Sequence, residues 1–250
     1  MRLETFAVEA EIEATHWWFV GRRQLFAREL ARAGLSPDSR VLDVGTGTGA
    51  NLRLLRDLRV RHVTGLDGSD AAIQYCRAKG LGDVRRGDIC AMPFADGSFD
   101  FVLATDVIEH VEADAAALRE VARVLKDGGK ALLAVPAFPS LWGLQDVVAQ
   151  HKRRYRLRPL LREMRAAGLE PRRYYHFNYL LFVPIWIARR LIDLFGIERD
   201  SEAEFNSPLL NRVLSAVFAC DVLTAPFLHA PFGVSILAVG TKPAHAGHDR

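Results

Sequence analysis

Cysteine is scarce in this 250-residue chain. Its three cysteines, Cys76, Cys90 and Cys220, form no C-x-x-C pair, so the sequence predicts neither a disulfide framework nor a cysteine-rich zinc site. This usage favours a reducing compartment, and we expect a cytoplasmic protein. The first twenty residues contain four glutamates and no basic segment followed by an apolar one, so no signal peptide is expected.

Internal repeats and low-complexity linkers are also missing, and the composition is that of a globular protein. Neither apolar stretch is expected to span a membrane. The stretch 177–195 is interrupted by Asn178, Pro184, Arg189 and Arg190, and the stretch 222–241 contains prolines. A helix end, a turn and a core strand account better for the second stretch.

The chain is organised around a glycine-rich turn at residues 41–51, VLDVGTGTGAN. An apolar strand-type run precedes the turn and a helix-type pattern follows it. Glycines allow the backbone to turn sharply and to approach a ligand closely, and the N-terminus of the following helix offers free N–H groups. This arrangement is typical of a nucleotide pocket in an open α/β sheet.

Strand and helix patterns alternate from residue 40 onward, which predicts a doubly wound α/β fold with a parallel sheet. A long helix is expected first, over residues 3–33, with an interruption at His16–Phe19. The expected strands are 40–44, 62–67, 83–87, 99–104, 130–136, 172–179 and 233–240, and the expected later helices are 50–59, 70–79, 113–125, 157–167 and 207–224.

Two nucleotide cofactors fit the glycine turn. Gly45-x-Gly47-x-x-Ala50, followed by Asp67 after the second strand, matches the NAD fingerprint. S-adenosylmethionine (SAM) fits better, because Asp43 suits a cationic amino group and would oppose a pyrophosphate. Asp88 and Ile89 after the third strand suit an adenine ring, through a hydrogen bond and an apolar cover.

These motifs together resemble the class I SAM-dependent methyltransferases, and specifically the broad subgroup that includes ubiquinone-biosynthesis enzymes. The resemblance covers residues 38–137 and includes Asp106–His110 and the loop 123–129. It implies a Rossmann-like, seven-stranded sheet with an antiparallel last strand. We therefore divide the chain into a helical N-terminal lid (1–37), a SAM-binding core (38–178 with 232–242) and an apolar helical insertion (179–231).

The resemblance also implies a set of cofactor-binding residues. The loop 43–49 is expected to hold the methionyl part of SAM. Asp67 is expected to bind the ribose, and Asp88 and Ile89 are expected to bind the adenine. Simpler roles, turn capping by Asp43 and helix capping by Asp67, stay open. The complete set is Asp43, Gly45, Thr46, Gly47, Gly49, Asp67, Gly68, Asp88, Ile89 and Thr105.

Methyl transfer from a sulfonium is an in-line displacement, so the protein mainly aligns the acceptor and excludes water. A general base helps when the acceptor is a hydroxyl or a protonated amine. His110, just after the fourth strand, is the candidate base, although a histidine that only packs locally fits equally well. Asp100 is expected to be structural, and no metal-binding constellation is apparent.

Acceptor specificity is expected outside the shared core. Residues 151–190 carry a net charge of +9 against −6 for the remainder, and the insertion beside them is apolar. Basic residues next to an apolar surface suit a phosphorylated lipid or a membrane interface, and the arrangement resembles bacterial methyltransferases of envelope glycans and polyprenyl-linked sugars. Candidate substrate-binding residues are Trp18 and Arg22 of the lid, and His151, Arg153, Arg154 and Tyr155 of the basic segment.

The sequence therefore predicts a methyltransferase, acting through O- or N-methylation on a small-molecule or lipid- or glycan-linked acceptor. Peripheral contact with the inner membrane face is expected through residues 152–195. A SAM-binding membrane protein without turnover and an NAD-dependent oxidoreductase are the alternatives. Helices of the insertion that pair with each other, or form a dimer interface, also explain its apolar character. Nucleic acid is disfavoured by the few aromatic residues in the basic segment.

Overall fold

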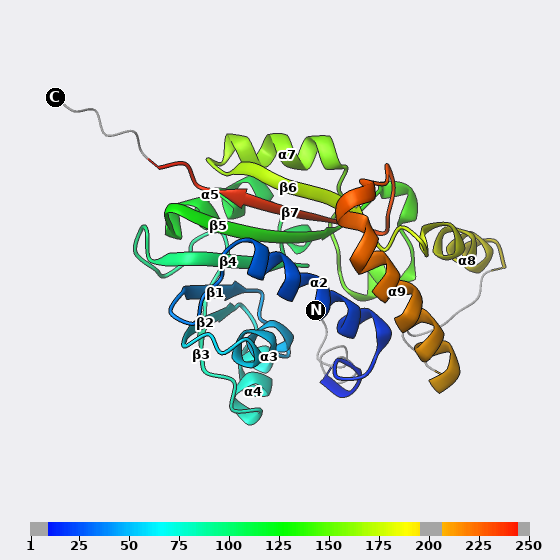
Figure 1. Ribbon diagram of the computed structural model, residues 1–250, viewed down its shortest axis with the longest axis horizontal. Helices are drawn as coiled ribbons and strands as arrows, with labels where there is room; N and C mark the ends of the chain where they lie inside the picture. Colours follow the sequence, from blue (N-terminus) through cyan, green and yellow to red (C-terminus); the bar gives the residue numbers. More distant parts are fainter. Residues whose placement is uncertain (1–9, 196–206, 245–250) are drawn as a thin grey trace.

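The computed structural model describes residues 10–195 and 207–244 (Figure 1). Its sheet has the order β3-β2-β1-β4-β5-β7-β6, and β7 runs antiparallel to both β5 and β6. This confirms the predicted α/β class and the antiparallel last strand. The strands are β1 (Arg40–Val44), β2 (His62–Asp67), β3 (Asp83–Arg86), β4 (Phe99–Thr105), β5 (Leu125–Pro136), β6 (Glu170–Phe177) and β7 (Ser235–Thr241).

Helices cover both faces of the sheet (Figure 1). On one face, apolar side chains of α2 (Trp17–Arg32), α3 (Ala50–Asp57) and α9 (Pro208–Leu228) share a core with the strands. On the other face, α5 (Asp114–Val124) and α7 (Leu157–Ala166) do the same. The remaining helices are α4 (Asp70–Ala78), α6 (Leu144–Val148), α8 (Phe182–Phe195) and the short 3₁₀ turns η1 (Ile108–His110) and η2 (Pro139–Leu141).

The N-terminal helix begins later than the sequence pattern predicts. Helix α2 begins at Trp17, because His16 adopts an extended conformation and its ring nitrogen caps the helix by accepting the Trp18 N–H at 3.3 Å. A separate helical turn over residues 10–12 precedes this break. Residues 1–9 of the expected helix lie outside the described part of the chain.

Aromatic side chains join α2 to the insertion. The ring of Trp18 stacks on that of Phe218 in α9 with centroids 5.5 Å apart, and Phe177 at the end of β6 stacks on the same ring. Gly21 faces this contact, because a Cβ atom there would lie 2.1 Å from the Phe218 ring. Helices α2 and α9 therefore pack against each other and α9 also packs on β6, so the aromatic residues expected in a lid serve partly as core.

The insertion exposes much of its apolar surface. Helix α9 is long and apolar enough to cross a membrane by length and composition, with a mean hydropathy of 1.3, and 22% of that window is buried inside the protein. Such a helix is weak evidence for a span, since core helices pass the same test. The inner side of α9 is occupied by Phe218, Val222 and Ala225 of the core. Its exposed apolar residues include Leu209, Val213, Leu223 and Phe227, and those of α8 include Trp186, Ile187, Leu191 and Leu194.

Replacement of Phe218 by alanine is expected to lower the free energy of unfolding by about 3–5 kcal/mol, because a buried aromatic ring is removed from a packed core. Urea denaturation of the purified chain measures this change. Leu209→Ala, on the exposed side of the same helix, should stay within about 0.5 kcal/mol of the parent. Equal effects of the two substitutions would show that α9 does not dock on α2.

Candidate functional site

The glycine turn connects β1 to α3, and its conformation requires glycine. Gly45, Gly47 and Gly49 have φ angles of 70°, 55° and 93°, which other residues adopt rarely. A Cβ atom on Gly45 would also lie 2.6 Å from the Val107 side chain. The turn therefore lies closely against the segment that follows β4, as a ligand-binding loop at this edge of the sheet must.

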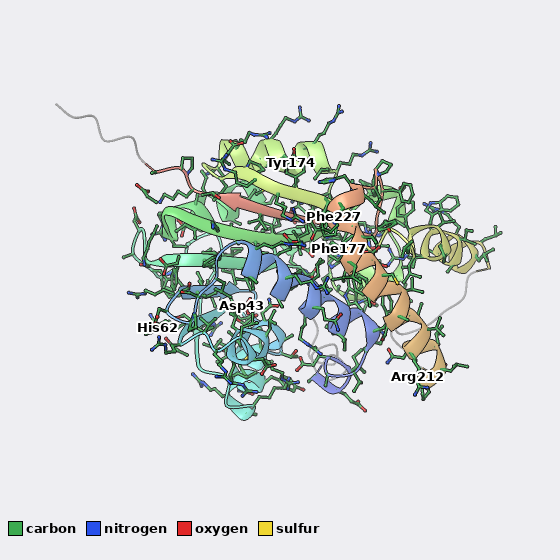
Figure 2. The ribbon with its side chains drawn as sticks, viewed as in Figure 1. Asp43, His62, Tyr174, Phe177, Arg212 and Phe227 are labelled. Carbon is green, nitrogen blue, oxygen red and sulfur yellow. The ribbon has the colours of Figure 1, made fainter. Side chains whose placement is uncertain are left out.

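Asp43 lies at the carboxyl end of β1 and is completely buried (Figure 2). Its Oδ1 accepts a hydrogen bond of 2.8 Å from Asn51 Nδ2, which also donates to Thr105 Oγ1 at 2.9 Å. Its Oδ2 has no hydrogen-bond partner within the described residues. Burial raises the pKa of Asp43 to about 7, against the opposing effect of Asn51. This carboxylate is therefore poised for a positively charged or hydrogen-bond-donating ligand.

Asp67, at the end of β2, fastens the glycine turn. Its Oδ2 accepts the Gly47 N–H at 2.9 Å, and its Oδ1 accepts the Ser69 N–H at 2.8 Å beyond Gly68. Ser69 is the N-cap of α4. Asp67 is therefore not the helix cap considered above: it joins the glycine turn to the residue that caps α4, and its carboxylate lies at the mouth of the turn.

The two residues predicted to bind adenine, Asp88 and Ile89, lie in different environments, one at a turn and one in the core. Asp88 Oδ1 accepts the Cys90 N–H at 2.8 Å and shapes the turn after β3. Ile89 is 6% exposed and packs in the core with Leu66 and Met92. Ile89 therefore supports the turn after β3 from the interior of the protein.

The N-terminal segment reaches the same edge of the sheet. Arg22 of α2 forms an ion pair with Asp106, which follows β4 and has a left-handed φ of 52°. Glu13 is buried against the turn, where it binds Thr48 and lies 2.9 Å from Lys79 Nζ. Arg22 is thus brought to the site as predicted, whereas Trp18 packs on Phe218.

A second cluster of polar side chains lies beside Asp106. Glu109 and His110 belong to η1, and His151 follows α6; His151 Nε2 lies 4.0 Å from Glu109 Oε1. The rings of His110 and His151 are 4.8 Å apart between centroids. Glu109 is fully buried, and neither carboxylate oxygen has a hydrogen-bond partner within the described residues. Burial, with a contribution from Asp106, raises the pKa of Glu109 well above its usual value.

Asp146 holds this cluster in place. Its Oδ1 lies 2.8 Å from His151 Nδ1 and 2.8 Å from Arg154 Nε, and its Oδ2 accepts the Gly143 N–H at 2.9 Å. Burial opposes ionisation, but the hydrogen bonds from His151 and Arg154 keep the pKa of Asp146 below its usual value. Because Asp146 is ionised, His151 Nδ1 carries the proton and donates.

The basic run 152–155 is engaged in contacts within the chain, and the pair of Lys152 lies at the surface. Lys152 pairs with Glu112 at 3.0 Å, and Arg153 pairs with Asp114 at 2.9 Å. The Tyr155 hydroxyl lies 3.0 Å from Asp114 Oδ2. Of the predicted substrate-binding residues in this segment, His151 lies in the cluster and Arg154 supports it through Asp146. Arg153 and Tyr155 join the segment to η1 and α5. Asp146 and Glu109 were not predicted, since no local pattern links positions that distant.

Asp100 has the structural role that the sequence predicts. Its carboxylate accepts the Arg40 N–H at 2.8 Å and binds Lys126 Nζ at 2.7 Å. These bonds join the amino end of β1 to the loop before β5. This end of the sheet is opposite to the one that carries the glycine turn.

Comparison with known proteins gives a consistent picture. Residues 42–133 match a family model described as a methyltransferase domain. A protein of Encephalitozoon cuniculi that is named as a methyltransferase is 38% identical over 121 residues, 47% of this chain and 50% of its own length. Sterol 24-C-methyltransferase of Schizosaccharomyces pombe is 35% identical over 105 residues, 39% of this chain and 28% of its own length. The chain thus spans half or less of the length of these relatives.

Among solved structures, a chain from the complex between the Haloferax volcanii Trm112 methyltransferase activator and a methyltransferase is similar in fold. The TM-score is 0.66 at 24% identity, over 98% of this chain and 97% of that chain. The domain match covers the glycine turn, Asp67, Asp88 and the segment after β4, and the sheet order extends the likeness to the complete fold. Residues 42–133 thus carry a match to a methyltransferase domain, and the chain has the fold of the class I SAM-dependent methyltransferases.

Proposed function

We propose that this chain transfers the methyl group of SAM to a small-molecule acceptor carried on or dissolved in lipid. The observation that carries the proposal is the buried Asp43 carboxylate, whose Oδ2 lacks a partner within the described residues. A buried carboxylate oxygen without a partner is costly, and the α-ammonium group of SAM would satisfy it. NAD would instead bring its pyrophosphate toward this negative charge, which disfavours the oxidoreductase alternative.

The residues around the turn suit the rest of the SAM molecule. When bound, SAM supplies an activated methyl group on a sulfonium. Asp67 stands at the mouth of the turn, where its oxygens can exchange the Gly47 and Ser69 amides for ribose hydroxyls. Thr105 and the Arg22–Asp106 pair border the side toward η1. Arg22 and α2 thereby limit access of water from the N-terminal side.

His110 is suited to accept a proton from an acceptor hydroxyl or ammonium group. Burial, and secondarily the neighbouring His151, lower the pKa of His110 to about 4. The imidazole is therefore neutral near pH 7 and has a lone pair available, although the low pKa makes it a weaker base than an ordinary histidine. Its place in η1, directly after β4, puts it on the acceptor side of the turn.

The acceptor class is proposed from the insertion and from relatives. One relative is named as a sterol methyltransferase and another, from Arabidopsis thaliana, as a 2-methyl-6-phytyl-1,4-hydroquinone methyltransferase; both names denote hydrophobic acceptors. Helices α8 and α9 lie at one side of the molecule (Figure 1). Both expose large apolar side chains. We propose that these helices, rather than the internally paired run 152–154, contact the membrane, and that the protein acts at the cytoplasmic membrane surface.

Asp67→Ala is expected to weaken binding of S-adenosylhomocysteine by roughly tenfold to a hundredfold, since two hydrogen bonds to a charged group are lost. Isothermal titration measures this change, and thermal unfolding establishes that the variant is folded. Asp83→Ala, an exposed acid on the neighbouring strand β3, should bind like the parent. Unchanged affinity of Asp67→Ala would contradict the proposed cofactor site.

Asp43→Asn is expected to change the pH dependence of stability. The folded-state pKa of Asp43, about 7, lies above the ordinary value of 3.8, so the titration of Asp43 lowers the stability of the parent as pH rises from about 4 to 7 and has no further effect above that range. Asparagine lacks this titration. Between pH 5 and pH 8, the free energy of unfolding of the variant should therefore rise relative to that of the parent by on the order of 2 kcal/mol. Urea denaturation without cofactor measures this difference. Parallel curves for the two proteins would contradict the buried ionisation.

Trp186→Ser combined with Leu194→Ser on α8 is expected to reduce binding to phosphatidylglycerol vesicles at least about tenfold, because exposed apolar area is removed. Vesicle flotation measures the bound fraction. Arg162→Ser, an exposed change on α7, serves as the control and should bind like the parent. If the double variant floats as well as the parent, α8 does not contact lipid.

A further inference from the structure

The geometry points to a divalent metal site formed by Glu109, His110 and His151, of the zinc type with two histidines and one carboxylate. We propose that it binds a zinc-like ion beside the segment that follows β4. One ligand atom from each of the three side chains lies within 4.8 Å of the other two. The site comes from two segments, since η1 supplies two ligands and the stretch after α6 supplies the third.

The buried carboxylate of Glu109 is the first argument. It is completely buried, and neither of its oxygens has a hydrogen-bond partner within the described residues. His151 faces it with Nε2 at 4.0 Å from Oε1. The tautomer of His151 that donates from Nδ1 to Asp146, 2.8 Å away, leaves Nε2 directed at Glu109 as a ligand atom. A metal ion between Nε2 and the carboxylate would supply the partner that the buried Glu109 oxygens lack.

The distances suit an ion better than a direct hydrogen bond. At 4.0 Å, Nε2 and Oε1 are too far apart to share a hydrogen bond. Zinc binds imidazole nitrogen and carboxylate oxygen at about 2.0–2.2 Å. At these bond lengths, two ligand atoms of a tetrahedral zinc ion lie roughly 3.3–3.6 Å apart, so a small approach of His151 to Glu109 and a movement of His110 would close the site.

Hydrogen bonds already orient both imidazole rings. His151 is held through Nδ1 by Asp146, which is itself fixed by Arg154 and the Gly143 amide. His110 has a backbone hydrogen bond with Gln150. Metal-binding histidines almost always use their second ring nitrogen in this way, because it fixes the tautomer that offers a lone pair to the ion. Both rings thus have the support that a ligand histidine needs.

Three protein ligands leave coordination positions open, which is the arrangement of catalytic zinc sites. A zinc-like ion here would bind the oxygen of an acceptor hydroxyl and lower its pKa, so that the oxygen attacks as an alkoxide or phenolate. The O–H proton passes to solvent, because His110 as a metal ligand no longer has a free lone pair to accept it. The acceptor oxygen bonds to the methyl carbon, and the carbon–sulfur bond of the donor breaks. This catalytic role rests on the proposed function, whereas metal binding does not.

The test is isothermal titration of the metal-free full chain with Zn²⁺, together with the visible absorption of the Co²⁺-loaded protein. We expect one tightly bound ion per chain. Glu109→Gln, which keeps the side-chain shape, should abolish stoichiometric binding and change the Co²⁺ spectrum. Asp146→Asn should weaken binding about 10- to 100-fold through loss of the support to His151. His62→Gln, an exposed histidine on β2 (Figure 2), should bind like the parent.

Titration with S-adenosylhomocysteine on the same samples separates this proposal from the methyltransferase assignment. Loss of metal binding in Glu109→Gln with cofactor binding retained supports the site. A parent protein that binds the cofactor but no stoichiometric Zn²⁺ overturns the metal site and leaves the proposed function intact. Equal Zn²⁺ affinity of Glu109→Gln and the parent also overturns it, because the ion is then held elsewhere.

Discussion

Negative charge gathered at one edge of the sheet is the constraint on which this structure depends. Asp43, Asp67, Asp106 and Glu109 all lie at or just beyond the carboxyl ends of parallel strands. Such proximity is unfavourable at low dielectric unless each charge is compensated. Backbone amides compensate Asp67 and Arg22 compensates Asp106. Within the described residues, one oxygen of Asp43 and both oxygens of Glu109 have no hydrogen-bond partner. Bound cations would therefore stabilise this edge of the sheet.

The sequence was sufficient for the parts of the site that are built locally. The glycine turn, with Asp43 before it and Asp67 one strand later, follows from strand–turn–helix chemistry within short stretches. The seven-stranded sheet and the antiparallel β7 followed from the family resemblance, and the structure confirms both. The roles of the individual cofactor-binding residues stay predictions. Ile89 shows the limit of this approach, since its place in the chain was predicted but its burial in the core was not.

What the sequence could not show depends on contacts between distant segments. The meeting of Glu109 with His151 and the position of Asp146 between them carry no periodic signal. The charge of the segment 151–190 was evident, but its pairing was not. Arg153 forms an ion pair with Asp114. Part of the positive charge that suggests a binding surface is therefore neutralised by acids of the same chain. Composition counts charges, whereas their availability depends on which acids the fold brings beside them.

Strands β6 and β7 are adjacent and antiparallel, so a turn of a few residues would join them. The chain instead places α8 and α9 between Phe177 and Ser235. Because the two strands pair with each other over their whole length, the sheet does not depend on the length of what connects them. This connection is therefore a position where evolution can exchange one acceptor-binding element for another without disturbing the cofactor half. Diversity of acceptors among proteins of this fold would then accumulate here, while the glycine turn stays the same.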